Sequence, residues 1–539
     1  MLDTTNNRNI SLNENKPSIF CFHLGVLLFA PYLNKLFDNK LQYIRQFLVA
    51  VLLGCQNIEQ TKELNYSSLN RIIGKTHKTL HIQRIRLKDA ATKSNIEHVL
   101  KFNSELLKVN QQSDFYYDPH TKHYSGDLKI LSTWCPSVRL ADKGINMDYI
   151  HTVSGHPVYF NTNDNFYDLR ERFISNINNF KTLVDFDKES ILTFVIDRGI
   201  YSAEIFNKII ENPKTHIITW EKGYKKNKWD TNADYLTGAI VRKRNNSNDI
   251  RLVYYHYQEN IWDKNSRMKQ IIVRIFDKYW NVLIEVSVIT DDKNRPTQEI
   301  IELMLCRWIQ ENDFKYMIKH FGINQITSYA FTNYKSLRDK IEDKIYTCSK
   351  HKSLTKEIQK VRAKLKTALL KKYKFTEKYK YSEKEISKSQ QKRKDEIWKS
   401  VIDLNDSLTA FELERKNTTK LVSRIDEIIE QNYKKLDTNT KDFFDAIRIL
   451  ARNIFYLTFE SMKNKYDNYR DDHVLFRHFT RSSGTIEANQ KYLKILLNPQ
   501  MEYQPKIKKI LTQVIDEINQ MNPKIPDGSN RKIKLYLNI

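Results

Sequence analysis

The chain has 539 residues, which is too long for one hydrophobic core and suggests two to four domains. Apolar residues make up 40% of it, which is enough for folding and excludes a largely disordered chain. The formal net charge of +25 points to a polyanionic partner, with nucleic acid as the first candidate and an anionic membrane as the second. Lys, Asn and Ile are also abundant in proteins from AT-rich genomes, which is the alternative reason for the charge.

The cysteines and the most apolar run both favour a reducing, aqueous compartment. The five cysteines are scattered without a Cys-x-x-Cys pair, which argues against a disulfide framework and a zinc ribbon. Residues 19–33 are apolar, but the run is too short for a typical transmembrane helix and contains His23 and Pro31. Asp3 precedes the first basic residue, Arg8, unlike a signal peptide. We expect a core helix here, in a soluble cytoplasmic protein with no membrane partner.

Helical patterns fill the first part of the chain. Residues 1–17 are polar and Asn-rich and are expected to form a loose tail. From 18 to about 105, apolar residues recur every three or four positions, which predicts a helical N-terminal domain over 1–105. Within it, SSLNRIIGKTHKTLHIQRIRL (67–87) joins a short helix, a Gly break and a basic stretch. This segment is either a helix-turn-helix DNA reader or part of an ordinary helical bundle.

Between 113 and 222 the pattern of apolar residues predicts alternating strands and helices. SDFYYDPHT is predicted to be a strand that ends at Asp118, and KHYSG and GHPVYFNT are predicted to be short strands. ILTFVIDRG is a continuous apolar run typical of a strand buried on both faces. NFYDLRERFISNINNF and YSAEIFNKII are predicted helices, and THIITWEKG is another strand. This β-β-β-α-β-α-β order predicts a mixed sheet with helices packed on it.

A strand-rich segment over about 223–293 interrupts this α/β core, which we place at 106–330. DIRLVYYHYQ, KQIIVRIFD and NVLIEVSVIT are predicted to be neighbouring antiparallel strands. The last helix of the core is predicted to start near Thr297 and to run through Glu311. It should bury an apolar face formed by Leu303, Trp308, Phe314 and Met317.

Residues 331–539 form a basic region that is mostly helical. A coiled-coil seam with steps of four, three and four residues is predicted at Leu354, Ile358, Val361 and Leu365. A hinge is predicted at 382–394, before a return helix, and KYLKILLNP and KIKLYLNI are predicted to be small strands. Over 346–400, 18 Lys and Arg stand against 6 Asp and Glu. This arm is either simply solvated or contacts DNA, and the clustering of charge favours DNA contact.

Three acids stand where an α/β core forms its ligand crevice: Asp118 and Asp197 at predicted strand ends, and Glu311 on the last helix. Each alone has a simpler interpretation, as a turn former before proline, a helix cap and a salt-bridge partner respectively. Together, three carboxylates without a patterned Cys/His set suit Mg²⁺ or Mn²⁺. Two such ions support phosphoryl transfer, and Asp197 would then bridge both of them.

These pieces resemble bacterial insertion-sequence transposases of the DDE type, in the cut-and-paste group whose RNase H-like core carries a β insertion before the final acid. The resemblance covers roughly 45–330, through YYDPHT, YSG, GHPVYF, DNFYDLRERF, FVIDRGIYS and CRWIQENDFKYMIKHFGINQITSY. It implies a polynucleotidyl transferase and endonuclease that cuts and joins DNA at element ends. The implied cofactors are two Mg²⁺ (or Mn²⁺) ions on Asp118, Asp197 and Glu311. The implied partners are double-stranded DNA, both element ends and target, and a second copy of the chain in a homodimer on DNA.

The last helix of that family carries a Tyr, Arg, Glu, Lys signature with two, three and six residues between its members. Arg307 and Glu311 match the second and third positions of this signature. The sequence departs from it at the other two positions, which hold Met304 and Ile318. The DNA contact that the family's lysine makes would therefore come from another residue of this helix, and the candidates are Lys315 and Lys319.

Further expectations concern residues outside this signature. Arg198, beside Asp197, is a candidate for phosphate contact. Some members of the family stack an extruded base during hairpin formation, a role that Trp262 or Trp280 could fill, although a Trp in a β region is more often core. The alternative function is a catalytically inactive, transposase-derived DNA-binding protein. A structural basic coiled-coil protein would leave Asp197 unexplained, and other RNase H-like nucleases, such as junction resolvases, are usually smaller.

Overall fold

The computed structural model describes residues 18–74, 79–225, 228–243, 250–325, 330–380, 387–463, 465–466, 472–488, 491–499 and 502–538. The predicted tail (1–17), the joint of the helix-turn-helix candidate (75–78) and the first part of the predicted hinge (382–386) lie outside the described residues. The chain divides into two compact units. The first comprises 1–125, 132–329 and 437–539, and the second 126–131 and 330–436. These limits differ from those of the three predicted regions, because 437–539 packs with the N-terminal helices.

Helices dominate the N-terminal part, as the apolar spacing predicts: α1 (Ala30–Asp38), α2 (Arg45–Leu52), α3 (Tyr66–Ile72), α4 (Leu80–Ala90) and α5 (Lys93–Leu106). Every residue of α2 is buried, and this helix packs against α13 (Asn439–Lys463). The apolar run 19–33 is buried over Leu24–Ala30, but the prediction of one core helix there is wrong. The run is divided among β1 (Ser18–Cys21), a 3-10 helix and the start of α1.

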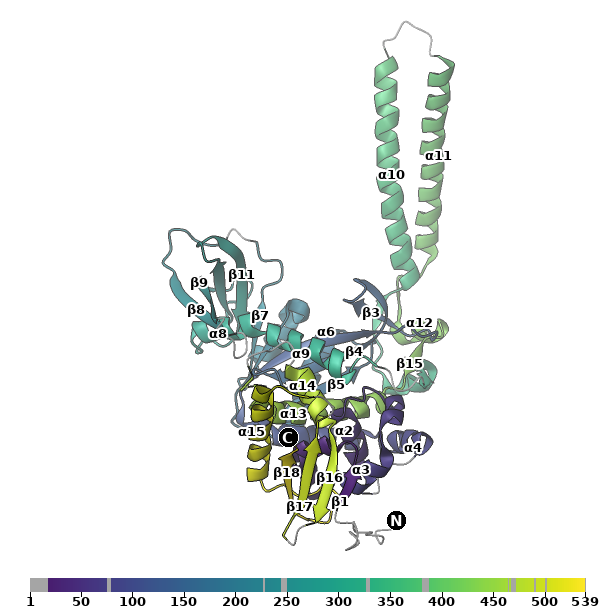
Figure 1. Cartoon of the computed structure of the whole chain (residues 1–539). Coiled ribbons are helices and arrows are strands. Elements are labelled where there is room, and N and C mark those ends of the chain that lie inside the picture. Colours follow the sequence, from purple (N-terminus) through teal and green to yellow (C-terminus); the bar gives the residue numbers. More distant parts are fainter. Residues whose placement is uncertain are drawn as a thin grey trace. The chain divides into compact units, whose positions relative to one another are not determined.

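The C-terminal part of the first unit forms a small sheet in the order β1-β16-β17-β18. Its further strands are β16 (Ser483–Ala488), β17 (Leu493–Asn498) and β18 (Ile533–Leu537), and the last two confirm the predicted small strands. In addition to α13, this part of the chain contains two more helices, α14 (Asp472–Thr480) and α15 (Pro505–Gln520). Because β1 pairs with β16, the two ends of the described chain are tied into one sheet (Figure 1).

A ten-stranded mixed sheet forms the centre of the first unit, in the order β3-β4-β2-β6-β7-β11-β10-β9-β8, with β5 paired to β4. Its strands are β2 (Asp114–His123), β3 (Ser132–Cys135), β4 (Leu140–Thr152), β5 (Pro157–Asn163), β6 (Leu192–Ile196), β7 (Thr215–Trp220), β8 (Leu236–Lys243), β9 (Ile250–Ile261), β10 (Lys269–Phe276) and β11 (Val282–Thr290). The strands β2, β6 and β7 are parallel to one another.

The strand predictions before α6 (Leu169–Val184) need two corrections. First, β2 does not end at Asp118 but continues to His123, so KHYSG is not a separate strand there. Pro119 is tolerated within β2 because β6 ends at Ile196, before the position beside the proline. At Pro119 the strand pairs only with β4, so the missing N–H does not interrupt pairing on the other side. Second, β3 and β4 were missed, because β4 begins with a polar stretch and its continuously buried part, residues 144–152, contains the polar residues Asn146, Asp148 and His151.

The strands of the predicted insertion are antiparallel neighbours, as expected, but they do not form a separate subdomain. The strand β11 pairs with β7 of the core, with Ile289 opposite Thr219. The insertion therefore continues the central sheet outward as β11-β10-β9-β8. It covers the edge that β7 would otherwise expose, and an uncovered edge strand is prone to pair with other chains.

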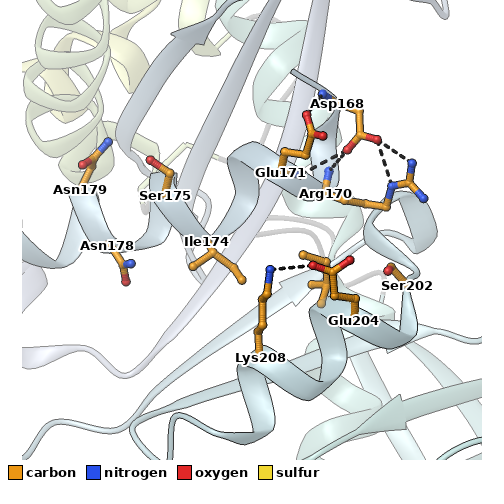
Figure 2. Close-up of a pocket in the computed structure, with 11 residues that line it drawn as sticks. Asp168, Arg170, Glu171, Ile174, Ser175, Asn178, Asn179, Ser202, Glu204 and Lys208 are labelled. Atoms are coloured by element: carbon orange, nitrogen blue, oxygen red, sulfur yellow. Dashed lines mark hydrogen bonds and ion pairs between the residues drawn. The ribbon is translucent and has the colours of Figure 1, made fainter. Parts of the chain in front are cut away.

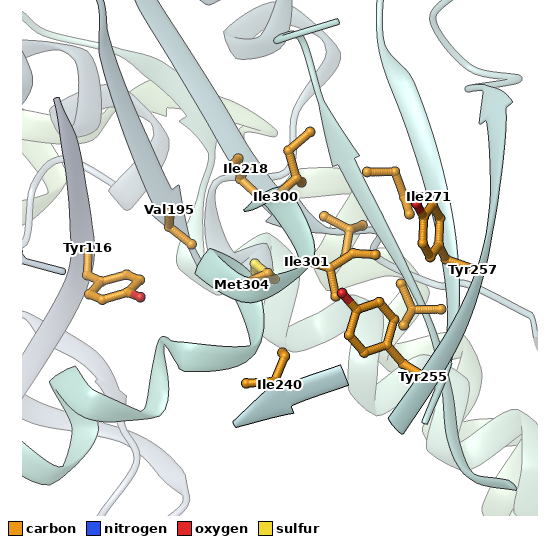
Figure 3. Close-up of a cluster of buried hydrophobic side chains, with 12 residues drawn as sticks. Tyr116, Val195, Ile218, Ile240, Tyr255, Tyr257, Ile271, Ile300, Ile301 and Met304 are labelled. Atoms are coloured by element: carbon orange, nitrogen blue, oxygen red, sulfur yellow. The ribbon is translucent and has the colours of Figure 1, made fainter. Parts of the chain in front are cut away.

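Helices cover both faces of the central sheet. On one face, α6 packs through Phe173, whose ring meets that of Tyr117 edge-on at 4.8 Å. On the other, the predicted last helix is present, but it is divided at Arg307 into α8 (Thr297–Cys306) and α9 (Trp308–Phe321). The core under α8 is apolar, as Figure 3 shows, and contains Tyr116, Val195, Ile218, Ile240, Tyr255, Tyr257, Ile271, Val273, Val288, Ile300, Ile301 and Met304.

The predicted apolar face of this last helix is confirmed in part. Phe314 and Met317 are buried, and Leu303 is partly buried against the core under α8. Trp308 is 43% exposed, however, so the prediction that its side chain is buried is wrong. Because the helix is interrupted at Arg307, Trp308 begins a new helix and does not continue the buried stripe of α8.

The second unit is built around two long helices, α10 (Ser349–Tyr379) and α11 (Lys388–Asn417), which run side by side (Figure 1). Leu354 and Ile358 of the predicted seam are buried, and Phe375 of α10 meets Trp398 of α11 edge-on at 6.1 Å. The unit also contains β12 (Phe331–Asn333), β13 (Ile345–Thr347), β14 (Leu421–Ser423), α12 (Arg424–Glu430) and β15 (Lys434–Leu436). The return helix begins at Lys388, inside the predicted hinge. None of the helices within the described ranges has the length and apolar composition needed to span a bilayer.

Candidate functional site

Two of the predicted acids lie on adjacent parallel strands. Asp118 belongs to β2, and Asp197 is the first residue after β6. The two strands pair with Tyr117 opposite Ile196, so the next residues, Asp118 and Asp197, stand beside each other. Side chains alternate along a strand, so Asp118 shares the face on which Tyr116 packs into the apolar core under α8. The two carboxylates thus meet at the rim of that core.

The backbone after β6 fixes the position of Asp197. All five residues of β6 are buried, and the chain turns directly after them into a 3-10 helix, Arg198–Ile200. Asp197 caps this short helix, since its Oδ1 accepts a hydrogen bond from the N–H of Arg198 at 2.8 Å. A Cβ at Gly199 would lie 2.9 Å from Cδ2 of Leu169, so the turn packs closely on α6. The side chain of Arg198 is exposed beside the acid.

Arg307 joins the third acid to the first. Met304, three residues earlier, is 1% exposed and anchors α8 in the apolar core, which brings Arg307 above β2. Nη1 of Arg307 lies 3.6 Å from Oδ1 of Asp118, and Nη2 lies 3.0 Å from Oε1 of Glu311. The Arg307 side chain is 12% exposed, whereas that of Glu311 is 52% exposed. Glu311 is therefore a salt-bridge partner and also a neighbour of Asp118.

The electrostatics of the site centre on Asp118. Burial raises the pKa of its carboxyl group to about 7. The guanidinium of Arg307 opposes this rise, and the carboxylates of Asp197 and Glu311 add to it. The carboxyl group of Asp118 is therefore the group on which the charges of the other two predicted acids act.

The fit of these acids to a divalent cation has two sides. Carboxylate oxygens are the hard donors that Mg²⁺ and Mn²⁺ prefer, and the charges of Asp197 and Glu311 both act on the carboxyl group of Asp118. Within the part of the chain that the structure describes, however, no three Asp, Glu, His or Cys side chains form a ready-made metal cluster. The guanidinium of Arg307 bridges Asp118 and Glu311 instead. The donor set therefore suits the cation, while its arrangement is that of an arginine-bridged acid pair.

A buried polar network holds α9 behind these acids. Asp313, two residues after Glu311, receives hydrogen bonds from Nε and Nη2 of Arg452 at 2.8 and 2.5 Å. Its other oxygen lies 3.1 Å from Nε2 of His151. Nδ1 of that imidazole lies 2.8 Å from the side-chain amide of Gln310. The same amide also donates a hydrogen bond to the backbone carbonyl of Tyr116 in β2. Sequence reasoning missed this network, since the residues that each hydrogen bond joins lie more than 100 positions apart.

The remaining candidate residues of α8 and α9 are divided between core and surface. Met304, at the Tyr position of the family signature, is part of the core, and Ile318, at the Lys position, is 36% exposed. Lys315 and Lys319 are both exposed on α9. The structure therefore presents these two lysines to solvent on the helix that carries Glu311.

The tryptophan candidates are separated by burial. Trp262 is 3% exposed, and its ring meets that of Tyr201 edge-on at 5.8 Å, so it belongs to a core. Trp280 is 59% exposed in the turn between β10 and β11, with a positive φ of 64°. Its ring lies 5.3 Å from that of Tyr254. Trp280 is thus the one of the two that a base could reach.

A pocket of about 670 Å³ lies between α6 and α7 (Ala203–Ile210), as Figure 2 shows. Four of its five charged side chains form ion pairs, since Arg170 contacts Asp168 and Lys208 contacts Glu204. Its lining consists of Asp168, Arg170, Glu171, Ile174, Ser175, Asn178, Asn179, Ser202, Glu204, Ile205 and Lys208. None of the predicted site residues is among them, so this pocket is distinct from the candidate site.

Comparison with known proteins gives one decisive match. No curated protein matches the sequence. A solved structure, the cryo-EM structure of a piggyBac transposase synaptic complex with hairpin DNA, is similar over 56% of this chain and 69% of that one. Its identity of 9% and TM-score of 0.28 support no conclusion about fold or function. The family described as "Transposase protein", by contrast, matches residues 42–538, nearly the whole chain. The chain therefore belongs to this family of transposase proteins.

Proposed function

We propose that this protein is a DNA transposase of the bacterial insertion-sequence DDE type, with an RNase H-like arrangement of its central sheet. Asp118, Asp197 and Glu311 are its catalytic acids, and it cleaves DNA strands at element ends and transfers them to a target. The observation that carries the proposal is the position of Asp118 and Asp197 on adjacent parallel strands, with Arg307 joining Asp118 to Glu311. Membership of the transposase family supports the same conclusion.

In this proposal the three acids hold two Mg²⁺ or Mn²⁺ ions. Bound there, the ions would activate a water or a 3′ hydroxyl and stabilise the departing oxygen. Asp197 is held in place by its hydrogen bond from the backbone of Arg198. Arg307 lies between Asp118 and Glu311 and compensates their mutual repulsion. In this proposal the Glu311 side chain, which is 52% exposed, turns from the arginine toward the other acids when the ions bind.

DNA contacts follow from the exposed basic residues near the acids. We propose that Arg198, Lys315 and Lys319, all exposed, contact phosphate groups of the element end. Joining two element ends requires two active sites, so we propose a homodimer on DNA. The proposed setting is the bacterial nucleoid, where both element ends and target DNA are present.

The test is strand cleavage on DNA that carries the terminal sequences flanking the reading frame, with and without Mg²⁺. Asp197→Asn should abolish cleavage while leaving DNA binding in place, because the substitution removes a charge without changing the volume of the side chain. The control is Asp263→Asn, at an exposed salt bridge with Lys228, which should cleave normally. Unchanged cleavage in Asp197→Asn would contradict the three-acid proposal. Binding without cleavage by the unmodified protein would favour the inactive DNA-binding alternative.

A further inference from the structure

The second unit carries a continuous lysine stripe on one helix. Helix α10 contains eleven Lys and Arg and two Glu. Seven of its lysines share one helix face at spacings of three, four and seven residues, and all seven side chains are exposed. We call this face the lysine stripe, which consists of Lys352, Lys356, Lys360, Lys364, Lys371, Lys374 and Lys378. At 1.5 Å per residue the stripe is about 39 Å long.

The stripe faces away from the contact with α11. The seam residues Leu354 and Ile358 are buried, and they lie on the opposite side of the helix, about 160–200° around its axis from Lys356. The basic residues of α10 that do pair with α11 are others, since Lys350 contacts Glu414 and Arg362 contacts Glu412. The lysine stripe therefore has no part in holding the two helices together.

Most of the stripe is not neutralised within the described residues. Lys356, Lys364, Lys371 and Lys374 have no ion pair in the described part of the chain, whereas Lys360 pairs with Glu357 on its own helix. Like charges four residues apart destabilise a helix. A helix that accumulates them along one face thus loses stability by doing so, which a merely solvated helix has no reason to do.

Helix α11 provides the contrast within the same unit. It carries seven Lys and Arg against six Asp and Glu, so it is almost neutral. Its outward face mixes both signs, with Lys388, Lys392 and Lys399 near Asp395 and Asp403. The excess positive charge of this pair of helices is therefore concentrated on one face of α10, not spread evenly as a composition bias would leave it.

We propose that the lysine stripe binds the phosphate backbone of double-stranded DNA. The choice of DNA as the polyanion rests on the proposed function. That this face binds a polyanion at all is inferred from the aligned lysines alone. Its length of about 39 Å slightly exceeds one turn of duplex DNA, about 34–36 Å, so one straight helix can contact phosphates on both sides of a groove. Lysine acts on phosphate as a point charge without base readout, so this contact is independent of sequence.

The test measures the affinity of the full-length protein for a random-sequence duplex of about 40 base pairs over a range of salt concentrations, without divalent cations. Each phosphate contact adds about 0.9 to the slope of log K against log salt. The variant Lys356→Gln/Lys364→Gln/Lys371→Gln should therefore lower the magnitude of that slope by roughly 3 and weaken binding at low salt at least tenfold. Circular dichroism should show that the helices persist, because the substitutions remove repulsion.

The matched control is Lys388→Gln/Lys392→Gln/Lys399→Gln on α11, which removes the same charge and should leave the slope unchanged. An equal decrease of the salt-dependence slope in both variants, or no decrease in the α10 variant, would overturn the proposal. Vesicles containing phosphatidylserine form a second arm. If the α10 variant lost vesicle binding and kept the DNA slope, the stripe would be a membrane contact instead. Because no cleavage is measured, the outcome is independent of the Asp197→Asn test.

Discussion

Arg452 of α13 donates two hydrogen bonds to Asp313 of α9, at 2.8 and 2.5 Å, and both side chains are buried. This pair fastens the helix that carries Glu311 to a helix from the C-terminal part of the chain. The C-terminal segment 437–539 is therefore a structural support of the candidate site.

The first prediction concerns this pair. Burial works against the charged form of Asp313, but Arg452 and His151 outweigh it and hold the pKa of the carboxyl group below its ordinary value. Asp313→Asn leaves Arg452 buried without a counter-charge, so unfolding free energy should fall by about 3–5 kcal/mol. Urea unfolding measures this, with Asp263→Asn at an exposed salt bridge as the control, for which a change below about 1 kcal/mol is expected. A loss in Asp313→Asn as small as the control's would contradict the role of the pair.

The second prediction is that ionised Asp118 lowers the free energy of unfolding at neutral pH. Its pKa in the folded protein, about 7, lies above the unfolded value of about 3.9, so the fold favours the protonated carboxyl. Its stability contribution is full below about pH 4 and is lost as pH rises to about 7. Asp118→Asn, measured in a chelator, should therefore be more stable than the unmodified protein by about 2–4 kcal/mol at pH 8.

The advantage of Asp118→Asn should disappear toward pH 4, where the carboxyl group is protonated in both states. Glu189→Gln, at an exposed salt bridge with Lys214, is the control and should show no such pH-dependent gain. If Asp118→Asn were destabilised at pH 8, the three acids would not repel one another as their arrangement indicates.

The third prediction contrasts two tryptophans of the extended sheet. Trp262 is 3% exposed, so Trp262→Ala should cost about 3–5 kcal/mol through lost burial and a cavity. Trp280 is 59% exposed and has a φ of 64°, a conformation that glycine adopts without strain. Trp280→Gly should therefore change stability by less than about 1 kcal/mol in either direction. Thermal unfolding compares the two, and similar losses in both would show that Trp280 packs as core.

The fourth prediction is a loss of stability in acid that arises from the buried imidazole of His473 and the half-buried imidazole of His320. Burial, reinforced by Arg477, lowers the pKa of His473 to about 2 and that of His320 to about 4. These groups bind protons in the unfolded chain but not in the fold, so their contribution is present above about pH 6.5 and is lost as pH falls. Each should steepen the decline by about 1.4 kcal/mol per pH unit between about pH 6 and pH 4.

The variant His473→Phe removes one of these titrations and should make the decline with falling pH shallower, whatever its stability at pH 7. Its ring would join those of Phe455 and Phe459, whose centroids lie 4.8 and 6.1 Å from that of the imidazole. His81→Phe, on the exposed surface of α4, is the control and should leave the slope unchanged. An equal slope in His473→Phe and the unmodified protein would show that His473 is accessible to protons in the fold.

The sequence by itself determined the helical and strand character of most segments, because apolar spacing of two or of three to four residues reflects which side of an element is buried. It also placed Asp197 at the end of a buried strand and Arg307 four residues from Glu311, since both are local relationships. It could not determine that β2 continues past Pro119, because that depends on β6 ending opposite Tyr117.

Tertiary structure alone decided the remaining features of the site. The union of Asp118 with Asp197 depends on strand register, and the bridge from Asp118 to Glu311 depends on the division of the helix at Arg307. The pairing of Asp313 with Arg452 joins residues 139 positions apart, a separation at which the linear sequence gives no signal of proximity. Local patterns encode which face of an element is buried, whereas the partner that covers that face is chosen by the packing of the whole unit.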